Sequence, residues 1–408
     1  MGVPNILYIH SHDTGVAISP YGYQVSTPNL ERFARRAVRF THAFSVAPTC
    51  SPSRAGLLTG RYPHEVGMTG LAHRGFAWDD YQRHPAPRLS GLGYRSALCG
   101  VQHVAPRRRM LGYDEYIDDG LHGREYFDVP GLDPVNYDRG NARRAAEWIE
   151  RRATGSRHDV PAPSAAPHAE PAGSSQARRP QAEPWFLSVG FLATHRPFPG
   201  SEAVHTPSED RAAYHRAASE LDQAVGTVLE AVDRADLWDS TVVFFTTDHG
   251  VPFPGHKGEL RDAGTQVALM LWIPPGIAPP GQESAVVPGG VCDQLVSQID
   301  LYPTMLELAG EAPTSEGSCP APWEARSLLP ILAGRRDTAR DAVYAESNYH
   351  AAYEPARSVR TARYRLITRP GECLSRPPAN VDDCPEKELP RVREQLRHDH
   401  AEVELYDL

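Results

Sequence analysis

Short apolar runs that are typical of buried strands alternate with amphipathic segments that are typical of helices along most of this chain. Strands that are apolar on both sides need helices on both faces of their sheet, so the alternation predicts an α/β/α sandwich. The predicted strands are 5–9, 94–98, 185–191, 241–246 and 267–273. The predicted helices are 27–38, 141–152, 214–233 and 300–308.

The pattern changes towards the C-terminus, where short strands predict a small antiparallel sheet. These strands are 342–345, 356–361 and 364–368. Because 408 residues are many for one compact core, we divide the chain into a main α/β domain at 1–335 and a C-terminal subdomain at 336–408. Residues 153–184 are mostly Pro, Ala, Ser, Gly and Arg, which predicts a disordered insertion in the main domain.

Charge and apolar content limit the partners of this chain. The net charge of −9 argues against a surface that binds nucleic acid, and an anionic substrate would need a local cluster of cationic side chains. No apolar run is long enough to span a membrane. No charged and apolar leader precedes the first strand, and the six cysteines are too scattered for a disulfide scaffold, so we expect a cytoplasmic protein.

The segment 50–60 carries the strongest local signal. We expect Ser51 to cap a helix that starts at Pro52. Cys50 would then lie just ahead of a helix N-terminus, where backbone N–H groups and the helix dipole favour an anion, and Arg54 would add a cation one turn in. The alternative is a buried structural cysteine before an ordinary capped helix.

A His or Asp side chain follows each of the first four predicted strands. These residues are His12 and Asp13, then His103, then His195, and finally Asp248 and His249. Catalytic groups of an open α/β sheet collect at the carboxyl ends of its strands, so we expect these side chains to meet in one site. For any one of them alone, the alternative is a loop residue that faces solvent.

The segment 50–60 also matches the pattern Cys-x-Pro-Ser-Arg-x-x-x-Leu-Thr-Gly at every specified position, and on this motif the chain resembles the type I sulfatases. Residues 67–73, 103–106 and 248–254 are similar to segments of the heparan N-sulfatase-like members of that family. The resemblance implies an alkaline-phosphatase-like α/β/α sandwich with a mixed, mostly parallel central sheet and a C-terminal antiparallel subdomain. It also implies that a formylglycine-generating maturation enzyme oxidises Cys50 to formylglycine.

The same resemblance implies one divalent metal held by His12, Asp13, Asp248, His249 and the modified Cys50. Sulfatases usually carry two aspartates in the first pair, and His12 departs from that pattern. Two imidazoles beside two carboxylates favour manganese, zinc or iron over calcium. His10 is either a further ligand or a strand-end residue.

The resemblance also assigns Arg54, His103, His195 and Lys257 to the binding and protonation of the sulfuryl group. The family carries a lysine two residues before the histidine at position 103, and Val101 stands there in this chain. The neighbouring cations that could compensate are Arg107, Arg108 and Arg109.

The function implied is hydrolysis of a sulfate ester or N-sulfate of a small molecule or glycan. Two alternatives stay open: a phosphonate or phosphate ester hydrolase of the same superfamily, and an inert carbohydrate-binding relative. The final residues 404–407 normally precede a turn and a last helix in sulfatases, so the resemblance also implies a truncated subdomain.

Overall fold

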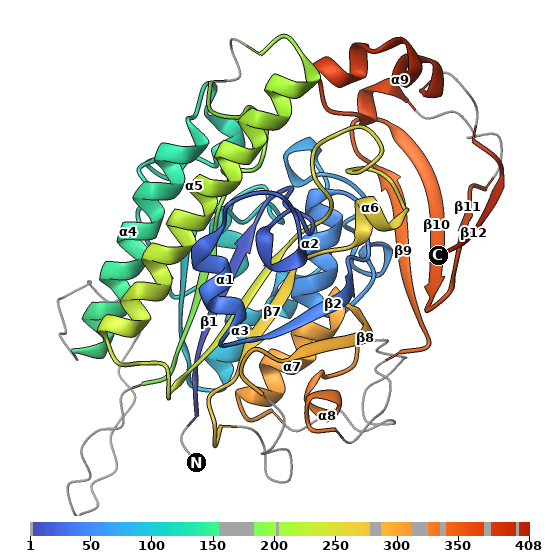
Figure 1. Ribbon diagram of the computed structural model, residues 1–408. Helices are drawn as coiled ribbons and strands as arrows, with labels where there is room; N and C mark the ends of the chain where they lie inside the picture. The colour runs from blue at the N-terminus through green and yellow to red at the C-terminus, as the bar shows by residue number, and fades with distance from the viewer. Residues whose placement is uncertain are drawn as a thin grey trace, which may run out of the picture.

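The computed structural model describes residues 3–154, 183–200, 204–277, 287–311, 325–334, 340–370, 377–396 and 400–408 (Figure 1). Most of the insertion predicted at 153–184 lies outside these described residues. The described cysteines Cys50, Cys99, Cys292 and Cys384 are free thiols. None of the described helices combines the length and the apolar character that a membrane crossing requires.

The main domain is built on an eight-stranded sheet with the order β4-β3-β5-β1-β6-β7-β2-β8. Its strands are β1 (Asn5–Ser11), β2 (Val38–Phe44), β3 (Arg95–Gly100), β4 (Glu115–Tyr116), β5 (Trp185–Gly190), β6 (Thr241–Thr247), β7 (Leu269–Trp272) and β8 (Val291–Ser297). β7 pairs antiparallel with both of its neighbours, and the other pairs are parallel. The mixed, mostly parallel sheet that we predicted is therefore confirmed.

Helices cover both faces of this sheet. One face packs against α1 (Pro28–Ala34), α4 (Pro134–Ala153) and α5 (Pro207–Arg234), and the other against α2 (Cys50–Thr59), α3 (Pro85–Gly91), α7 (Leu301–Leu308) and α8 (Leu329–Leu332).

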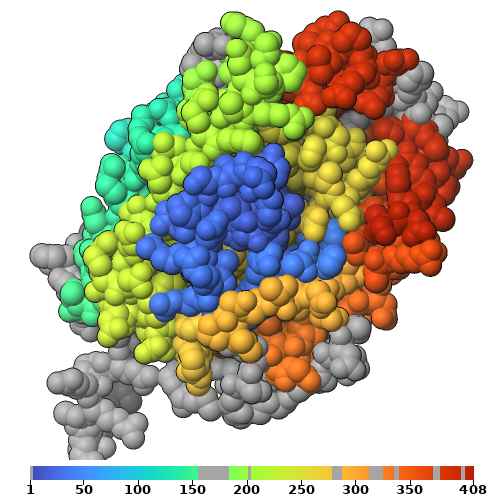
Figure 2. Space-filling model, in the orientation of Figure 1, coloured from blue at the N-terminus to red at the C-terminus, as the bar shows by residue number. Residues whose placement is uncertain are grey.

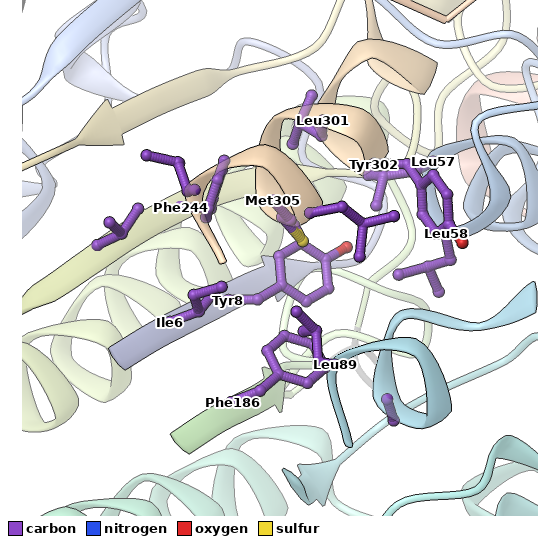
Figure 3. Close-up of a cluster of buried hydrophobic side chains, with 14 of the residues drawn as sticks. Ile6, Tyr8, Leu57, Leu58, Leu89, Phe186, Phe244, Leu301, Tyr302 and Met305 are labelled. Carbon is purple, nitrogen blue, oxygen red and sulfur yellow. The ribbon is translucent and has the colours of Figure 1, made fainter. Parts of the chain in front are cut away.

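β1 shows how the sequence creates these two cores. Its alternate residues Ile6 and Tyr8 enter the cluster with α2 and α7, which Figure 3 shows, whereas Leu7 and Ile9 enter the cluster with α4 and α5. Burying one such aliphatic side chain contributes about 1.5–3 kcal/mol. Strands that are apolar on both sides are thus what hold the two helical layers to the sheet.

The C-terminal part forms a four-stranded antiparallel sheet with the order β12-β11-β10-β9. Its strands are β9 (Ala342–Tyr349), β10 (Tyr353–Thr361), β11 (Tyr364–Thr368) and β12 (Val403–Asp407), and they confirm the predicted appended sheet. Two further short helices are α6 (Asp262–Thr265), which belongs to the main domain, and α9 (Pro390–Gln395), which belongs to the C-terminal part. Figure 2 shows the red α9 region against the green start of α5, where Arg211 Nη2 donates to Glu386 Oε2 at 3.0 Å.

Some local predictions were wrong. The helix predicted at 27–38 ends at Ala34, and Val38 starts β2, because it pairs with Leu271 of β7. Helix α2 begins at Cys50 with Thr49 as its N-cap, two residues earlier than predicted. Ser51 does not cap it, because the Ser51 hydroxyl accepts a hydrogen bond from the backbone N–H of Ala72 at 3.0 Å.

A buried ion pair joins the two parts of the chain. Asp300, at the start of α7, accepts hydrogen bonds from Arg340 Nε at 2.8 Å and from the backbone N–H of Arg326 at 2.7 Å. The side chains of Asp300 and Arg340 are both buried, so each charge depends on the other for its solvation.

We expect Arg340→Ala to lower the free energy of unfolding by about 3–5 kcal/mol, because it leaves the Asp300 carboxylate buried without its counter-charge. Denaturant titration measures this loss. The matched control is Arg234→Ala, which removes an ion pair of 2.8 Å with Glu150 at the surface and should cost less than about 1 kcal/mol. Equal losses in the two variants would contradict a structural role of the buried pair.

Candidate active site

One edge of the main sheet collects the polar side chains that follow its strands. β1, β3, β5 and β6 run parallel, so the segments that leave their carboxyl ends lie together, and β2 ends at the same edge before α2. Gly190 at the end of β5 allows a close approach, because a Cβ there would lie 2.1 Å from the Val101 carbonyl oxygen and 2.6 Å from His10 Cε1. A larger residue would force these strand ends apart.

Two buried carboxylates, Asp13 and Asp248, form the centre of the site. Asp248 Oδ1 accepts hydrogen bonds from the backbone N–H groups of Asp13 at 2.9 Å and His249 at 3.0 Å. Burial acts to raise the pKa of Asp248, but the electrostatic interactions with His249 and Arg54 and the hydrogen bond from the Asp13 N–H outweigh it, and the pKa lies below its ordinary value. Asp13 has a φ of 49°, a left-handed conformation that is strained for most side chains and clusters at functional sites.

Arg54, one turn into α2, ties this helix to the two strand ends. Its Nε donates to Asp248 Oδ2 at 3.2 Å, and its Nη2 donates to the Ser11 carbonyl oxygen at 2.8 Å. Its Nη1 lies 2.5 Å from His10 Nδ1. His10 is therefore a strand-end residue that positions Arg54, and Arg54 acts here by holding Asp248 in place.

Four side chains, those of His12, Asp13, Cys50 and Asp248, each place a potential ligand atom within 4.8 Å of the others. Neither ring nitrogen of the buried His12 has a hydrogen-bond partner among the described residues. Burial, followed by the Arg54 charge, lowers the pKa of His12 well below its ordinary value, so the neutral ring keeps a free lone pair. These residues fit a divalent metal, which would satisfy that lone pair and both carboxylates.

His249 completes this cluster. Its Nδ1 lies 3.0 Å from the Gly250 carbonyl oxygen, to which it donates, so Nε2 carries the lone pair. Nε2 lies 3.2 Å from Cys50 Sγ and 3.2 Å from Asp13 Oδ1. It is therefore directed at the same centre and is available as a further ligand.

Cys50 lies at the first position of α2, and its side chain is only 1% exposed. Burial raises the pKa of its thiol well above the ordinary value, although the nearby Lys257 charge acts in the opposite direction. A thiol that stays protonated is a weak nucleophile. Nucleophilic chemistry at this position is therefore better served by a modified side chain than by a thiolate.

A cavity of about 370 Å³ opens above Cys50, and His103, His195 and Lys257 line it. His195 Nδ1 lies 2.6 Å from the carbonyl oxygen of Arg196, which leaves Nε2 as the free nitrogen. His103 has a φ of 55°, a second left-handed residue in the site. The structure thus brings together at one edge all the residues that the sequence predicted for the site.

The C-terminal part also contributes to the cavity. Lys257 Nζ donates to Asp13 Oδ2 at 2.8 Å and to Asp382 Oδ2 at 3.0 Å. His350, which follows β9, places Nε2 3.9 Å from Asp382 Oδ1. Asn380 Oδ1 accepts hydrogen bonds from the backbone N–H groups of 351 and 352 at 2.9 and 2.7 Å, so the segments that carry His350 and Asp382 form one unit.

His73, Tyr126, His350 and Asp382 are among the cavity residues that sequence reasoning missed. None of them follows a predicted strand of the main sheet, and the motif around Cys50 gave no signal for them.

The three arginines considered as replacements for a cation at Val101 are not among the described residues that line the cavity. Arg107 Nη1 donates to Asp128, and the buried Arg108 pairs with Asp119 and Glu125. Arg109 stacks 5.8 Å from the ring of Tyr116. The compensation that we considered at these positions is therefore not supported.

Adding Mn²⁺ or Zn²⁺ to metal-stripped protein should raise the midpoint of thermal unfolding, because an ion that binds only the native state stabilises it by about 2.7 kcal/mol at 100 times its Kd. Asp13→Asn should lose most of this shift, and asparagine tolerates the left-handed backbone there. His73→Ala changes a cavity residue outside the ligand cluster and should keep the shift. Equal shifts in both variants would show that the ion binds elsewhere.

Comparison with known proteins identifies a matching family model and similar proteins. The family model described as Sulfatase matches residues 4–311. Over 387 residues the chain is 28% identical to human N-acetylgalactosamine-6-sulfatase, an alignment that covers 81% of this chain and 66% of that protein. Over 396 residues it is 28% identical to human N-sulphoglucosamine sulphohydrolase, with 89% of this chain and 72% of that protein covered. The chain thus spans about two thirds to three quarters of the length of these relatives.

Solved structures share the fold. One protein, determined in complex with its substrate D-glucosamine-2-N,6-O-disulfate, superposes with a TM-score of 0.65 at 18% identity and covers 100% of this chain and 91% of its own. The phosphonate monoester hydrolase of Agrobacterium radiobacter superposes with a TM-score of 0.60 at 20% identity and covers 90% of this chain and 87% of its own.

Proposed function

We propose that this chain, which belongs to the sulfatase family, removes sulfate from a sulfated sugar by hydrolysis of a sulfate ester or an N-sulfate. The observation that carries the proposal is the position of Cys50, within its complete maturation motif, in a cavity that it shares with His103, His195 and Lys257. Lys257 supplies a local positive charge that a chain with a net charge of −9 needs to accept an anion.

The nucleophile is the formylglycine that replaces Cys50. Because the Cys50 side chain is buried, the maturation enzyme must reach this segment before the chain folds. One hydroxyl of the hydrated aldehyde attacks sulfur and releases its proton, the bond from sulfur to the leaving oxygen or nitrogen breaks, and the leaving atom takes up one proton in exchange. The second hydroxyl then loses its proton, the bond from carbon to the sulfate oxygen breaks, and the aldehyde reforms as sulfate leaves.

The basic side chains divide the proton transfers and the charge stabilisation. Nε2 of His195 protonates the leaving atom, and His103 accepts the proton of the second hydroxyl, or the two histidines exchange these roles. His73 Nδ1, 3.0 Å from His103 Nε2, orients the ring of His103. Lys257 stabilises charge on the sulfuryl oxygens.

A divalent ion held by His12, Asp13, Asp248 and His249, with an oxygen of the modified residue at position 50, would supply Lewis-acid polarisation and lower the pKa of a bound hydroxyl. Two nitrogen and two carboxylate ligands favour manganese, zinc or iron, because calcium takes shells of oxygen ligands. Elemental analysis of the purified protein tests this preference, and a stoichiometric content of calcium alone would contradict it.

The substrate class that we propose is a sulfated amino sugar. The two human relatives at equal identity are named for hexosamines, one with an N-sulfate and one with an O-sulfate. A cavity of about 370 Å³ is of the size that holds a sugar unit.

A substrate panel separates the ester from the N-sulfate. Matured protein is assayed against N-sulfated glucosamine, 6-O-sulfated N-acetylgalactosamine, an aryl sulfate and an aryl phosphonate. Preferred turnover of either amino-sugar sulfate supports the proposal and assigns the bond. Preferred turnover of the phosphonate would favour the phosphonate hydrolase alternative, and an unmodified cysteine at position 50 after co-expression with the maturation enzyme would favour the inert one.

Cys50→Ala should abolish turnover, because the loss of a covalent nucleophile raises the barrier by far more than about 1.4 kcal/mol, the equivalent of tenfold in rate. Single-turnover and steady-state assays measure it, and mass spectrometry of the tryptic peptide reports the aldehyde in the wild type. Cys99→Ala is the matched control, since Cys99 is equally buried but donates to the Asn141 carbonyl oxygen away from the cavity. Residual activity of Cys50→Ala within tenfold of Cys99→Ala would contradict the proposed nucleophile.

A further inference from the structure

Tyr126 is a buried aromatic residue at the wall of the cavity that no step of the proposed reaction uses. It begins a single helical turn, Tyr126–Asp128, outside the strands of the main sheet. Its ring centroid lies 5.8 Å from that of His12, 5.4 Å from that of His103 and 6.3 Å from that of His195. The ring is therefore packed among the predicted metal ligand and both predicted proton carriers.

The Tyr126 side chain packs against apolar residues and also reaches the cavity. Tyr126 belongs to a hydrophobic cluster with Val101, Leu121, Tyr137 and Leu192, which fixes the position of the ring. The side chain also lines the cavity together with Cys50 and Lys257.

The Tyr126 side chain lines the same cavity as the two histidines that the proposed reaction uses, His103 and His195. The Tyr126 hydroxyl makes no hydrogen bond to any of the described residues. Its donor is thus available to a group that enters the cavity.

We propose that Tyr126 is a catalytic residue, whose hydroxyl donates a hydrogen bond to an oxygen of the sulfuryl group bound above position 50. This proposal rests on the proposed function. Donors aimed at developing charge in a site shielded from water stabilise a transition state strongly. Val101 packs in the same hydrophobic cluster as Tyr126 and supplies no cation. A phenol therefore donates in this site where the resemblance led us to expect an ammonium group.

A tyrosine phenol has an ordinary pKa of about 10 and carries its proton at neutral pH. The phenol therefore stays protonated and serves as a donor without becoming a base.

The test is Tyr126→Phe, which keeps the ring and its packing and removes only the hydroxyl. Tyr137→Phe is the matched control, because Tyr137 lies in the same cluster but donates to Asp119 Oδ2 at 2.9 Å, away from the cavity. With the amino-sugar sulfate turned over best by the wild type, we expect kcat/KM of Tyr126→Phe to fall about 10- to 100-fold. Tyr137→Phe should stay within about threefold of the wild type, and thermal unfolding establishes that both variants fold.

Inhibition by inorganic sulfate gives a second measurement of the same contact. We expect the inhibition constant of sulfate to rise by about tenfold in Tyr126→Phe and to stay unchanged in Tyr137→Phe. Loss of kcat/KM and of sulfate affinity in equal measure in the two variants would overturn the proposal, as would wild-type behaviour of Tyr126→Phe in both measurements.

The outcome for Tyr126 is separable from that for the proposed function. If the wild type turns over no sulfate of the panel, the proposed function fails, and calorimetric titration of the three proteins with inorganic sulfate then decides the role of Tyr126 alone. Weaker sulfate binding by Tyr126→Phe than by Tyr137→Phe supports the donor, and equal binding overturns it.

Discussion

The buried pair of Arg54 and Asp248 is the interaction on which the geometry of the site depends. Asp248 receives the backbone N–H of Asp13 from the end of β1, and Arg54 reaches the Ser11 carbonyl oxygen of the same strand. Helix α2, β1 and β6 are thus fixed to one another through two charged side chains. Because neither charge has access to water, each loses its solvation if the other moves, and this makes the arrangement rigid. Cys50, at the start of α2, owes its position to that rigidity.

A site rich in carboxylates must still accept an anion, and the arrangement of Lys257 explains how. Its ammonium group lies between Asp13 and Asp382, which belong to the main domain and the C-terminal part. A divalent ion bound to Asp13 would weaken the attraction of Lys257 to that carboxylate, while Asp382 would still hold Lys257 at the cavity. The C-terminal part therefore keeps a cation at the cavity, so it contributes to the site as well as to stability.

The sequence predicted much of the fold because the strands of the main sheet are apolar on both sides, a local property that period and composition reveal. It also predicted the strand-end residues, since topology alone sends His12, Asp13, His103, His195 and Asp248 to one edge. The sequence analysis missed the shorter and less regular strands. β2 follows α1 with only three residues between them, and a helical pattern absorbed its first residue. β4 is only two residues long, too short for any periodicity.

The sequence analysis missed three cavity residues for a different reason. Long-range packing creates the places of Tyr126, His350 and Asp382 in the cavity. Asp382 reaches Lys257 only since Asn380 binds the turn after β9, and Tyr126 reaches His12 only since Val101 and Leu192 support its ring. Neither relation leaves a local pattern in the chain. A motif thus specifies the residues close to Cys50, whereas the residues that shape the cavity depend on tertiary contacts. Substrate choice, which the cavity wall determines, is accordingly the property that the sequence motif constrains least.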